Sequence, residues 1–232
     1  MPILAAVRLA AALNHAVVTG TDVETMTGWV VGDDVAHHVI DSHGSGATAL
    51  TTAMDTLGFP GTGWMLALPR PGALGPLRGP VELNRTAMDA SAAVIGVDGG
   101  IAFVPHRVGP AVQWERFDAR RPGLLPTAAE ADQMLRHAIL EAANLLEGLD
   151  LASGIRPDPT EMPLPPGFGA RSQKAVVRGL NILTACDAAL DDHSEVLHAH
   201  GIHQRVTALT PVRAAAIDAI CATVSWGSGV TS

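Results

Sequence analysis

Residues 93–104 read Ala-Val-Ile-Gly-Val-Asp-Gly-Gly-Ile-Ala-Phe-Val, two apolar runs on either side of a tight turn. Asp98 and Gly99 supply residue types that readily take the left-handed backbone conformation of a short hairpin loop. The β-branched and aromatic residues of the flanking runs favour strands. This stretch therefore predicts a β-hairpin, and with it a partly antiparallel sheet in the first half of the chain.

Other segments of the first half also have the patterns of strands. Residues 64–68 are apolar at every position, which predicts a strand covered on both faces. In residues 112–116, Val112, Trp114 and Arg116 alternate with Gln113 and Glu115, and this alternation predicts an edge strand. The runs 29–31 and 35–40 flank a Gly-Asp-Asp turn signal and predict a second hairpin. Helices are expected between these strands, at 4–13, 47–57 and 82–90.

The second half has the patterns of helices. Thr127 and Glu130 have the spacing of a capping box, in which each side chain binds a free backbone N–H of the first helical turn. The apolar residues behind this box have helical spacing and are expected to face inward: Ala131, Met134, Ala138, Ala142, Leu145 and Leu149. Further helices are expected over 171–190 and from Pro211 onward, where Thr210 would be the cap.

These elements predict an α+β protein with one compact domain over residues 1–232. Its first part, 1–118, would hold a mixed, partly antiparallel sheet, and helices mainly from 119–232 would pack against that sheet. Residues 154–169 contain five prolines and predict an extended connector within the second part. The 47% of apolar residues in 232 is ample for a core and excludes a disordered chain.

Composition also narrows the partners and the compartment. The net charge of −8 disfavours nucleic-acid binding, and two cysteines are too few for a disulfide scaffold. No basic segment precedes the apolar residues 1–7, and no run of eighteen apolar residues occurs, so neither a signal peptide nor a membrane span is expected. We therefore expect a cytoplasmic protein with no nucleic-acid or membrane partner.

The local signatures of several large enzyme classes are missing from the sequence. It has no Gly-x-Ser-x-Gly, no Walker loop, no Gly-x-Gly-x-x-Gly, no Cys-x-x-Cys and no His-Glu-x-x-His. With no tyrosine, no phenol can serve as a general acid. The leading hypothesis is an accessory or small-ligand-binding protein without catalysis of its own and without a cofactor.

Two groups of carboxylates and histidines keep an enzymatic alternative open, a metal-assisted hydrolase using residues 187–203. On a continuous helix, four residues of the first group would share one face: Asp187, Asp191, Glu195 and His198, with His193, His200 and His203 nearby. The second group is His37, His38, Asp41 and His43. Residues 191–194 resemble a helix end and a new cap, and consecutive histidines on a strand point to opposite faces, so we expect no metal at either group.

A third group of polar side chains surrounds the Pro/Gly-rich loop at 69–80. Arg70, Asn84 and Arg85, with Arg78, lie near the end of a buried strand and the start of a short helix. Such places favour ligands, and arginine suits a carboxylate or a phosphate. The interpretation is a site for an anionic small molecule; the alternative is that these residues cap and solvate the loop.

The protein is expected to be a homodimer or larger oligomer. Its mean hydropathy is +0.25 and only 16% of its residues are charged, too few to cover a domain surface without apolar patches. The outer faces of the helices at 131–146 and 211–226, with Trp226 as an anchor, are the expected contacts. A purely structural partner-binding protein is a further alternative.

Several short motifs follow one another in an order that resembles that of a known family. They are Leu-Ala-Leu-Pro-Arg-Pro-Gly at 66–72, Gly-Pro at 79–80, Asn84, Pro-Pro-Gly-Phe at 165–168, Arg171 and Thr-Pro at 210–211. Together they resemble a set of conserved proteins of high-GC actinobacteria to which no activity is assigned. The resemblance implies no catalytic residue.

Overall fold

The computed structural model describes residues 1–232 except 1, 42–45, 59–61, 148–156, 192–198 and 227–232. The chain divides into two compact units. Unit 1 consists of Met1–Leu125, Leu164–Ala170 and Val224–Ser232. Unit 2 consists of Pro126–Pro163 and Arg171–Thr223. The boundary after Leu125 lies close to the change of character expected at 118.

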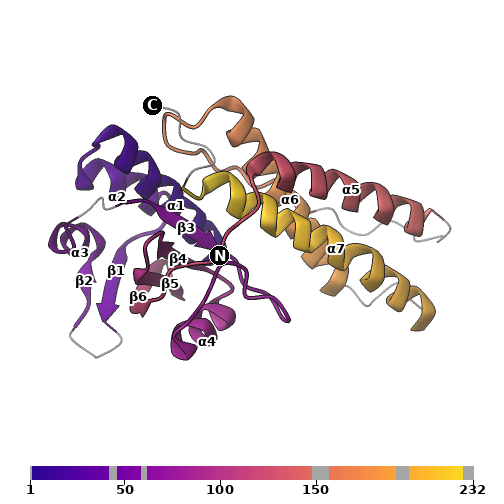
Figure 1. Ribbon diagram of the computed structural model, residues 1–232, viewed down its shortest axis with the longest axis horizontal. Helices are drawn as coiled ribbons and strands as arrows, with labels where there is room; N and C mark the ends of the chain where they lie inside the picture. The colour runs from indigo at the N-terminus through magenta and orange to yellow at the C-terminus, as the bar shows by residue number, and fades with distance from the viewer. Residues whose placement is uncertain (1, 42–45, 59–61, 148–156, 192–198, 227–232) are drawn as a thin grey trace. The chain divides into compact units, whose positions relative to one another are not determined.

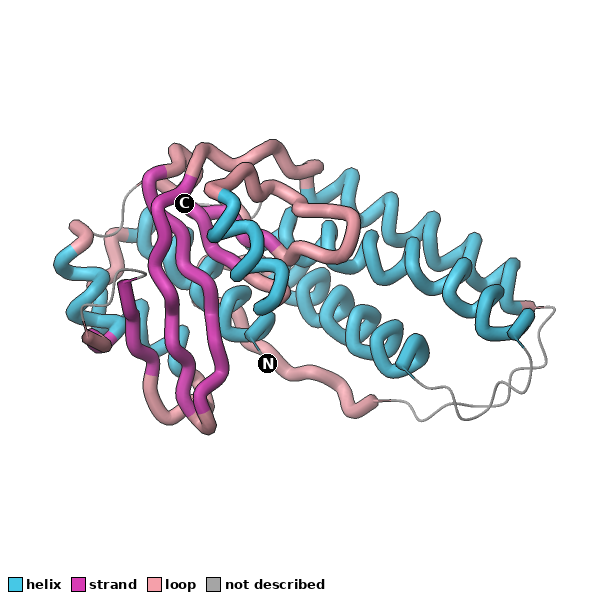
Figure 2. Tube along the Cα trace, turned by 90° about the horizontal axis from the view of Figure 1, so that it is seen from below, coloured by secondary structure: helices cyan, strands magenta, loops and turns pink. Residues whose placement is uncertain are grey.

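Unit 1 contains a six-stranded sheet with the order β2-β1-β6-β5-β4-β3. Its strands are β1 (His37–Asp41), β2 (Thr48–Ala49), β3 (Trp64–Ala67), β4 (Ala93–Gly96), β5 (Gly100–Val108) and β6 (Ala111–Ala119). The pair β1 and β6 is parallel and every other neighbouring pair is antiparallel. Figures 1 and 2 show the strands of this sheet from two sides. The α+β class, the mixed sheet and the hairpin at 93–104 are thus confirmed.

Two helices contact opposite faces of this sheet (Figure 1). Helix α1 (Pro2–Thr19) contacts β3, β4 and β5, while α4 (Val81–Ala90) contacts β5 and β6. The core on the α4 side is made of small and aliphatic side chains and one aromatic: Ala67, Leu77, Leu83, Ala87, Ala93, Ile95, Ala102, Val104 and Phe117. Helix α2 (Val23–Val31) packs on α1, and α3 (Leu50–Thr56) packs on α2, β1 and β2.

Strand β3 lies at one end of the sheet, and polar groups outside the sheet bind its outer edge. The Asn14 amide accepts a hydrogen bond from Trp64 N and donates to Trp64 O and Val224 O, each at 2.8 Å. Further along, Leu66 N donates to Ser225 Oγ at 3.0 Å and Trp226 N donates to Trp64 O at 2.8 Å. These bonds satisfy backbone groups that an edge strand otherwise exposes.

Unit 2 contains three long helices, α5 (Ala128–Leu146), α6 (Ala170–Asp191) and α7 (Ala199–Val224). An ion pair between Asp132 and Arg178 joins α5 to α6. Helices α6 and α7 are joined by Arg213 Nε on Asp187 Oδ1 at 2.5 Å. They approach closely at Gly179, where an added Cβ would lie 2.7 Å from Ile220.

Residues 157–165 of the expected connector form neither helix nor strand. Thr160 N donates to Asn181 Oδ1, and Gln173 Nε2 donates to Met162 O, both at 2.7 Å. These two amides therefore hold the chain against α6 in the antiparallel direction.

The capping box at the start of α5 is also confirmed. The Thr127 hydroxyl accepts from Glu130 N at 3.2 Å, and Thr127 N donates to Glu130 Oε2 at 2.8 Å. The prediction that the apolar residues after this box face inward is partly wrong. Ala131 and Ala142 are buried, but Met134 is 43% exposed and Leu145 is 54% exposed. Leu135 takes the buried position instead.

Three further expectations are corrected by long-range contacts. Residues 29–31 end helix α2, capped by Asp22, rather than starting a hairpin, because Met26 and Val30 bury a helical face. Strand β6 is not an edge strand, since β1 pairs with it in parallel. Helix α7 runs through Pro211 without a new start, because Ala208 and Val212 continue one buried face across it.

Two helices, Pro2–Thr19 and Gly201–Val224, are long and apolar enough to cross a membrane by length and composition alone. In the structure, 61% and 56% of the residues in the apolar 18-residue window of each helix are buried inside the protein. A helix in the core of a soluble protein meets the same test.

Candidate ligand-binding cleft

A cleft of about 410 Å³ lies on the sheet face that also contacts α1, beside helix α3. Because side chains alternate along strands, Trp64, Gly96, Ile101 and Arg116 share this face through the pairing of β3, β4, β5 and β6. Gly96 is the register partner of Trp64 and has no side chain. The lining of the cleft at Gly96 is therefore backbone alone.

The lining is mainly apolar with a few polar groups. Met54 of α3 and Leu57 just after it line the cleft together with Trp64 and Ile101 of the sheet. The indole of Trp64 packs against the ring of Phe103, with ring centroids 5.8 Å apart. The remaining lining residues are Thr62, Gly63, Gly99, Gly100, Arg116 and Asp118. This mixture is typical of sites for small molecules.

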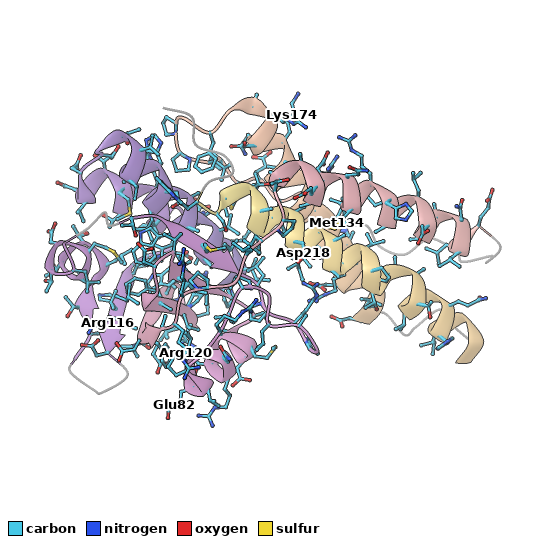
Figure 3. All side chains as sticks on the ribbon, viewed as in Figure 1. Glu82, Arg116, Arg120, Met134, Lys174 and Asp218 are labelled. Carbon is cyan, nitrogen blue, oxygen red and sulfur yellow. The ribbon has the colours of Figure 1, made fainter. Side chains whose placement is uncertain are left out.

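Arg116 is the cation of this cleft and lies beside β1 (Figure 3). Its register partner on β1 is Asp41, and its Nε lies 2.7 Å from Asp41 Oδ1. Besides Nε, the guanidinium of Arg116 carries N–H donors on its two terminal nitrogens. A smaller hollow of about 120 Å³, lined also by Asp41, Thr48 and Leu57, meets the cleft at Arg116.

Two glycines allow other groups to approach the rim of the cleft. Gly63 has a φ of +129°, and the indole of Trp226 occupies the position that a Cβ would take. Gly99 has a φ of +80°, and a Cβ there would lie 2.6 Å from Arg121 N. Both positions disfavour any other residue, so the rim is a built feature of unit 1.

A chain of hydrogen bonds links β6 to β1 and to the residues before β1, and its bond between Trp114 and His37 is buried. Trp114 Nε1 donates to His37 Nδ1 at 3.1 Å, so the proton of this imidazole is on Nε2, which lies 3.2 Å from Asp34 Oδ2. Asp34 also accepts from Arg107 at 2.6 Å. Burial lowers the pKa of His37, although the Asp34 carboxylate opposes this effect. His37 is therefore a neutral structural residue.

The residues expected to bind an anion lie outside this cleft. Arg70 belongs to a turn closed by two backbone hydrogen bonds with Ala73, at 2.8 and 2.9 Å. Arg78 donates to the carbonyls of Gly75 and Leu77. Arg78 therefore caps its own loop, as the alternative interpretation expected. Asn84 and Arg85 are neighbours on α4. Asn84 is half-buried, its Oδ1 has no partner among the described residues, and Arg85 is exposed.

The residues expected near a metal are divided between described and undescribed parts of the chain. Glu195, His198, His193 and His43 lie outside the described residues. Asp187 pairs with Arg213, and Asp191 is the last residue of α6. Within the described part, no three His, Cys, Asp or Glu side chains are close enough to hold a metal ion.

Sequence reasoning missed Arg116 and Asp118 as site residues. The alternation of 112–116 places Arg116 in the same row as Val112 and Trp114, which are both buried. A charged side chain in an apolar row is the signal that was present. Its partner Asp41 lies 75 positions away in sequence, and only the parallel pairing of β1 with β6 brings them together.

Fold and cleft together define an α+β protein with a cleft of small-molecule size on one face of a mixed sheet. Family models match nearly the whole chain: the N-terminal domain of the Rv1486c-like protein at residues 6–132 and the C-terminal domain at residues 129–221. The chain therefore belongs to the Rv1486c-like protein family, which is consistent with the actinobacterial resemblance. The junction of the two matches lies near the boundary between units 1 and 2. No curated protein and no solved structure matches the chain.

Proposed function

We propose that this protein is a cytoplasmic small-ligand-binding protein without catalysis of its own, and that its ligand is a small organic acid with an apolar body. The observation that carries the proposal is the position of Arg116, where the two hollows meet. Its Nε pairs with Asp41, its terminal nitrogens are further N–H donors, and a guanidinium binds a carboxylate through two parallel N–H···O bonds.

The rest of the cleft supports a ligand of this kind. Its volume lies in the range of small-molecule sites, and Met54, Leu57, Trp64 and Ile101 offer an apolar surface beside the cation. Asp118 at the exposed rim can accept a hydrogen bond from a hydroxyl or amine of the ligand. Since Asp41 and Asp118 are both acidic, a ligand with one negative charge is favoured over a polyanion.

The experiment is a thermal-shift series with acetate, hexanoate, phenylacetate and 4-phenylbutyrate. We expect the shift to increase with the apolar body, and the methyl ester of phenylacetate to give none. Arg116→Met should abolish the shift, whereas Arg120→Met, an exposed arginine just after β6 (Figure 3), should leave it unchanged.

The double substitution Arg70→Met with Arg85→Met separates this cleft from the site expected from the sequence. Neither residue lines the cleft, so binding should survive. Binding that is lost in this double variant and kept in Arg116→Met would place the site at the Pro/Gly loop. The absence of any shift with all four acids would contradict the proposed ligand class.

A further inference from the structure

Helix α5 of unit 2 has an exposed stripe that its own unit does not cover. Met134, His137, Glu141 and Leu145 follow one another at spacings of three, four and four residues, so they share one face of the helix. The two charged residues are 73% and 65% exposed at their side chains, and the two apolar residues are 43% and 54% exposed. Met134 is labelled on α5 in Figure 3.

The order of side chains along the stripe is apolar, basic, acidic, apolar. When two identical helices pack antiparallel about a two-fold axis near residues 139 and 140, position 134 of one copy faces position 145 of the other. Position 137 then faces position 141. Apolar residues meet apolar residues at both ends, and each histidine meets a glutamate in the middle.

We propose that this stripe is the interface of a homodimer, in which the α5 helices of two copies pack antiparallel. Parallel packing would place Glu141 against Glu141 of the second copy, which the like charges oppose. Within one copy, His137 Nε2 lies 3.3 Å from Glu141 Oε1, and this contact is available for exchange between copies. The stripe is therefore complementary to itself in the antiparallel orientation alone.

The structure revises the surfaces expected from composition. Most residues of α7 between 211 and 224 are buried, and Trp226 packs on Gly63 and binds β3 through its backbone. The face of α5 remains available. It is also the face on which Leu145 and Met134 depart from the inward orientation expected from their spacing.

The first test is the mass of the protein in solution at micromolar concentration. We expect about twice the chain mass of 23.9 kDa. Leu145→Asp and Met134→Asp should each weaken association at least tenfold and give the monomer mass. Leu140→Asp is the control, because Leu140 is 65% exposed on the same helix but lies about 100° around the helix axis from the middle of the stripe. Loss of the dimer in this control, or its survival in both stripe variants, would contradict the proposal.

Charge exchange tests the pairing in the middle of the stripe. His137→Glu should weaken association because it places two acidic side chains against each other. Adding Glu141→Lys to this variant should restore the dimer, since the pair is then reversed rather than lost. If the double variant is weaker than the single one, the two positions do not face each other and the antiparallel arrangement is wrong.

Disulfide formation tests the orientation without depending on an unstable variant. In the antiparallel dimer, Met134→Cys with Leu145→Cys should cross-link efficiently, whereas Met134→Cys alone should not, because its copies would be about 16 Å apart. The native Cys186 and Cys221 are buried, and burial raises the pKa of Cys186 to about 11, so they should not contribute. Cross-linking of the single variant would show a parallel arrangement and overturn the proposal.

Discussion

Helix α1 of unit 1 has eleven buried residues among eighteen, whereas α5 of unit 2 has three among nineteen. Both helices are rich in alanine and leucine, so composition does not explain the difference. Helix α1 contacts a sheet on one side and α2 on another. Helix α5 is joined to α6 on one side and leaves its opposite face to solvent or to a second copy. Apolar content determines that a helix can be buried, and the surrounding elements determine how much of it is.

The tryptophans allow the two units to be followed separately. All four, Trp29, Trp64, Trp114 and Trp226, belong to unit 1. Their fluorescence therefore reports the unfolding of unit 1, while circular dichroism at 222 nm reports helices of both units. Coincident transitions would support the single domain expected from the sequence, and separate transitions would show two domains.

The largest effect is expected at Asn14. Asn14→Ala removes three buried hydrogen bonds and leaves Trp64 N and the Val224 carbonyl without these partners. We expect the free energy of unfolding of unit 1 to fall by about 3–6 kcal/mol, measured by fluorescence in urea. Asn144→Ala, on the exposed surface of α5, is the matched control. It should change the free energy of unfolding by less than about 0.5 kcal/mol. Equal effects of the two substitutions would contradict the edge-closing role of Asn14.

A smaller effect is expected in unit 2, where two leucines of the same helix differ in burial. Leu135→Ala should cost about 2–5 kcal/mol because this side chain is fully buried. Leu145→Ala should cost less than about 1 kcal/mol in the monomer, since more than half of the side chain is already exposed. Circular dichroism in urea, at a concentration that keeps the protein monomeric, measures both. A larger loss for Leu145 would mean that the stripe faces the interior of the unit.

The smallest expected effect is the loss of stability of unit 1 at acidic pH. Burial lowers the pKa of both His15 and His37 in unit 1 from the usual 6.5. The unfolded chain then binds more protons than the folded one below pH 6.5, so the stability of unit 1 is complete above this pH and decreases as the pH falls. The slope is at most about 1.4 kcal/mol per pH unit for each histidine.

Two glutamine substitutions test this dependence by fluorescence in urea between pH 7.5 and 5.5. His37→Gln should reduce it, because glutamine can still accept from Trp114 but does not titrate in this range. His137→Gln, on the exposed face of α5, should leave it unchanged. An unaltered pH dependence in His37→Gln would show that His37 is not one of the groups that take up protons on unfolding.

Features with local signals could be predicted from the sequence. The hairpin at 93–104 and the capping box at Thr127 depend on residues within a few positions of each other, and both are confirmed. The features that failed depend on distant contacts. Strand β6 is central only because β1 pairs with it, and residues 29–31 are helical only because Met26 and Val30 pack inside unit 1.

The same reason applies to the cleft. The sequence contains Arg116, Asp41 and Trp64, but nothing local indicates that they surround one hollow, because they come from three strands. The order of these strands in the sheet places them together. A single sequence has no local signal for that order.

The closure of β3 by residues 224–226 has a consequence for synthesis on the ribosome. Every strand of the sheet has been translated by residue 119, but Ser225 and Trp226 follow more than a hundred residues later. Until these two residues emerge, Leu66 N lacks its native acceptor and Trp64 O lacks one of its native donors. The outer edge of β3 in the nascent sheet is then open to pairing with neighbouring chains. A ribosome that stalls between these positions would thus release a chain with a complete sheet and a surface prone to aggregation.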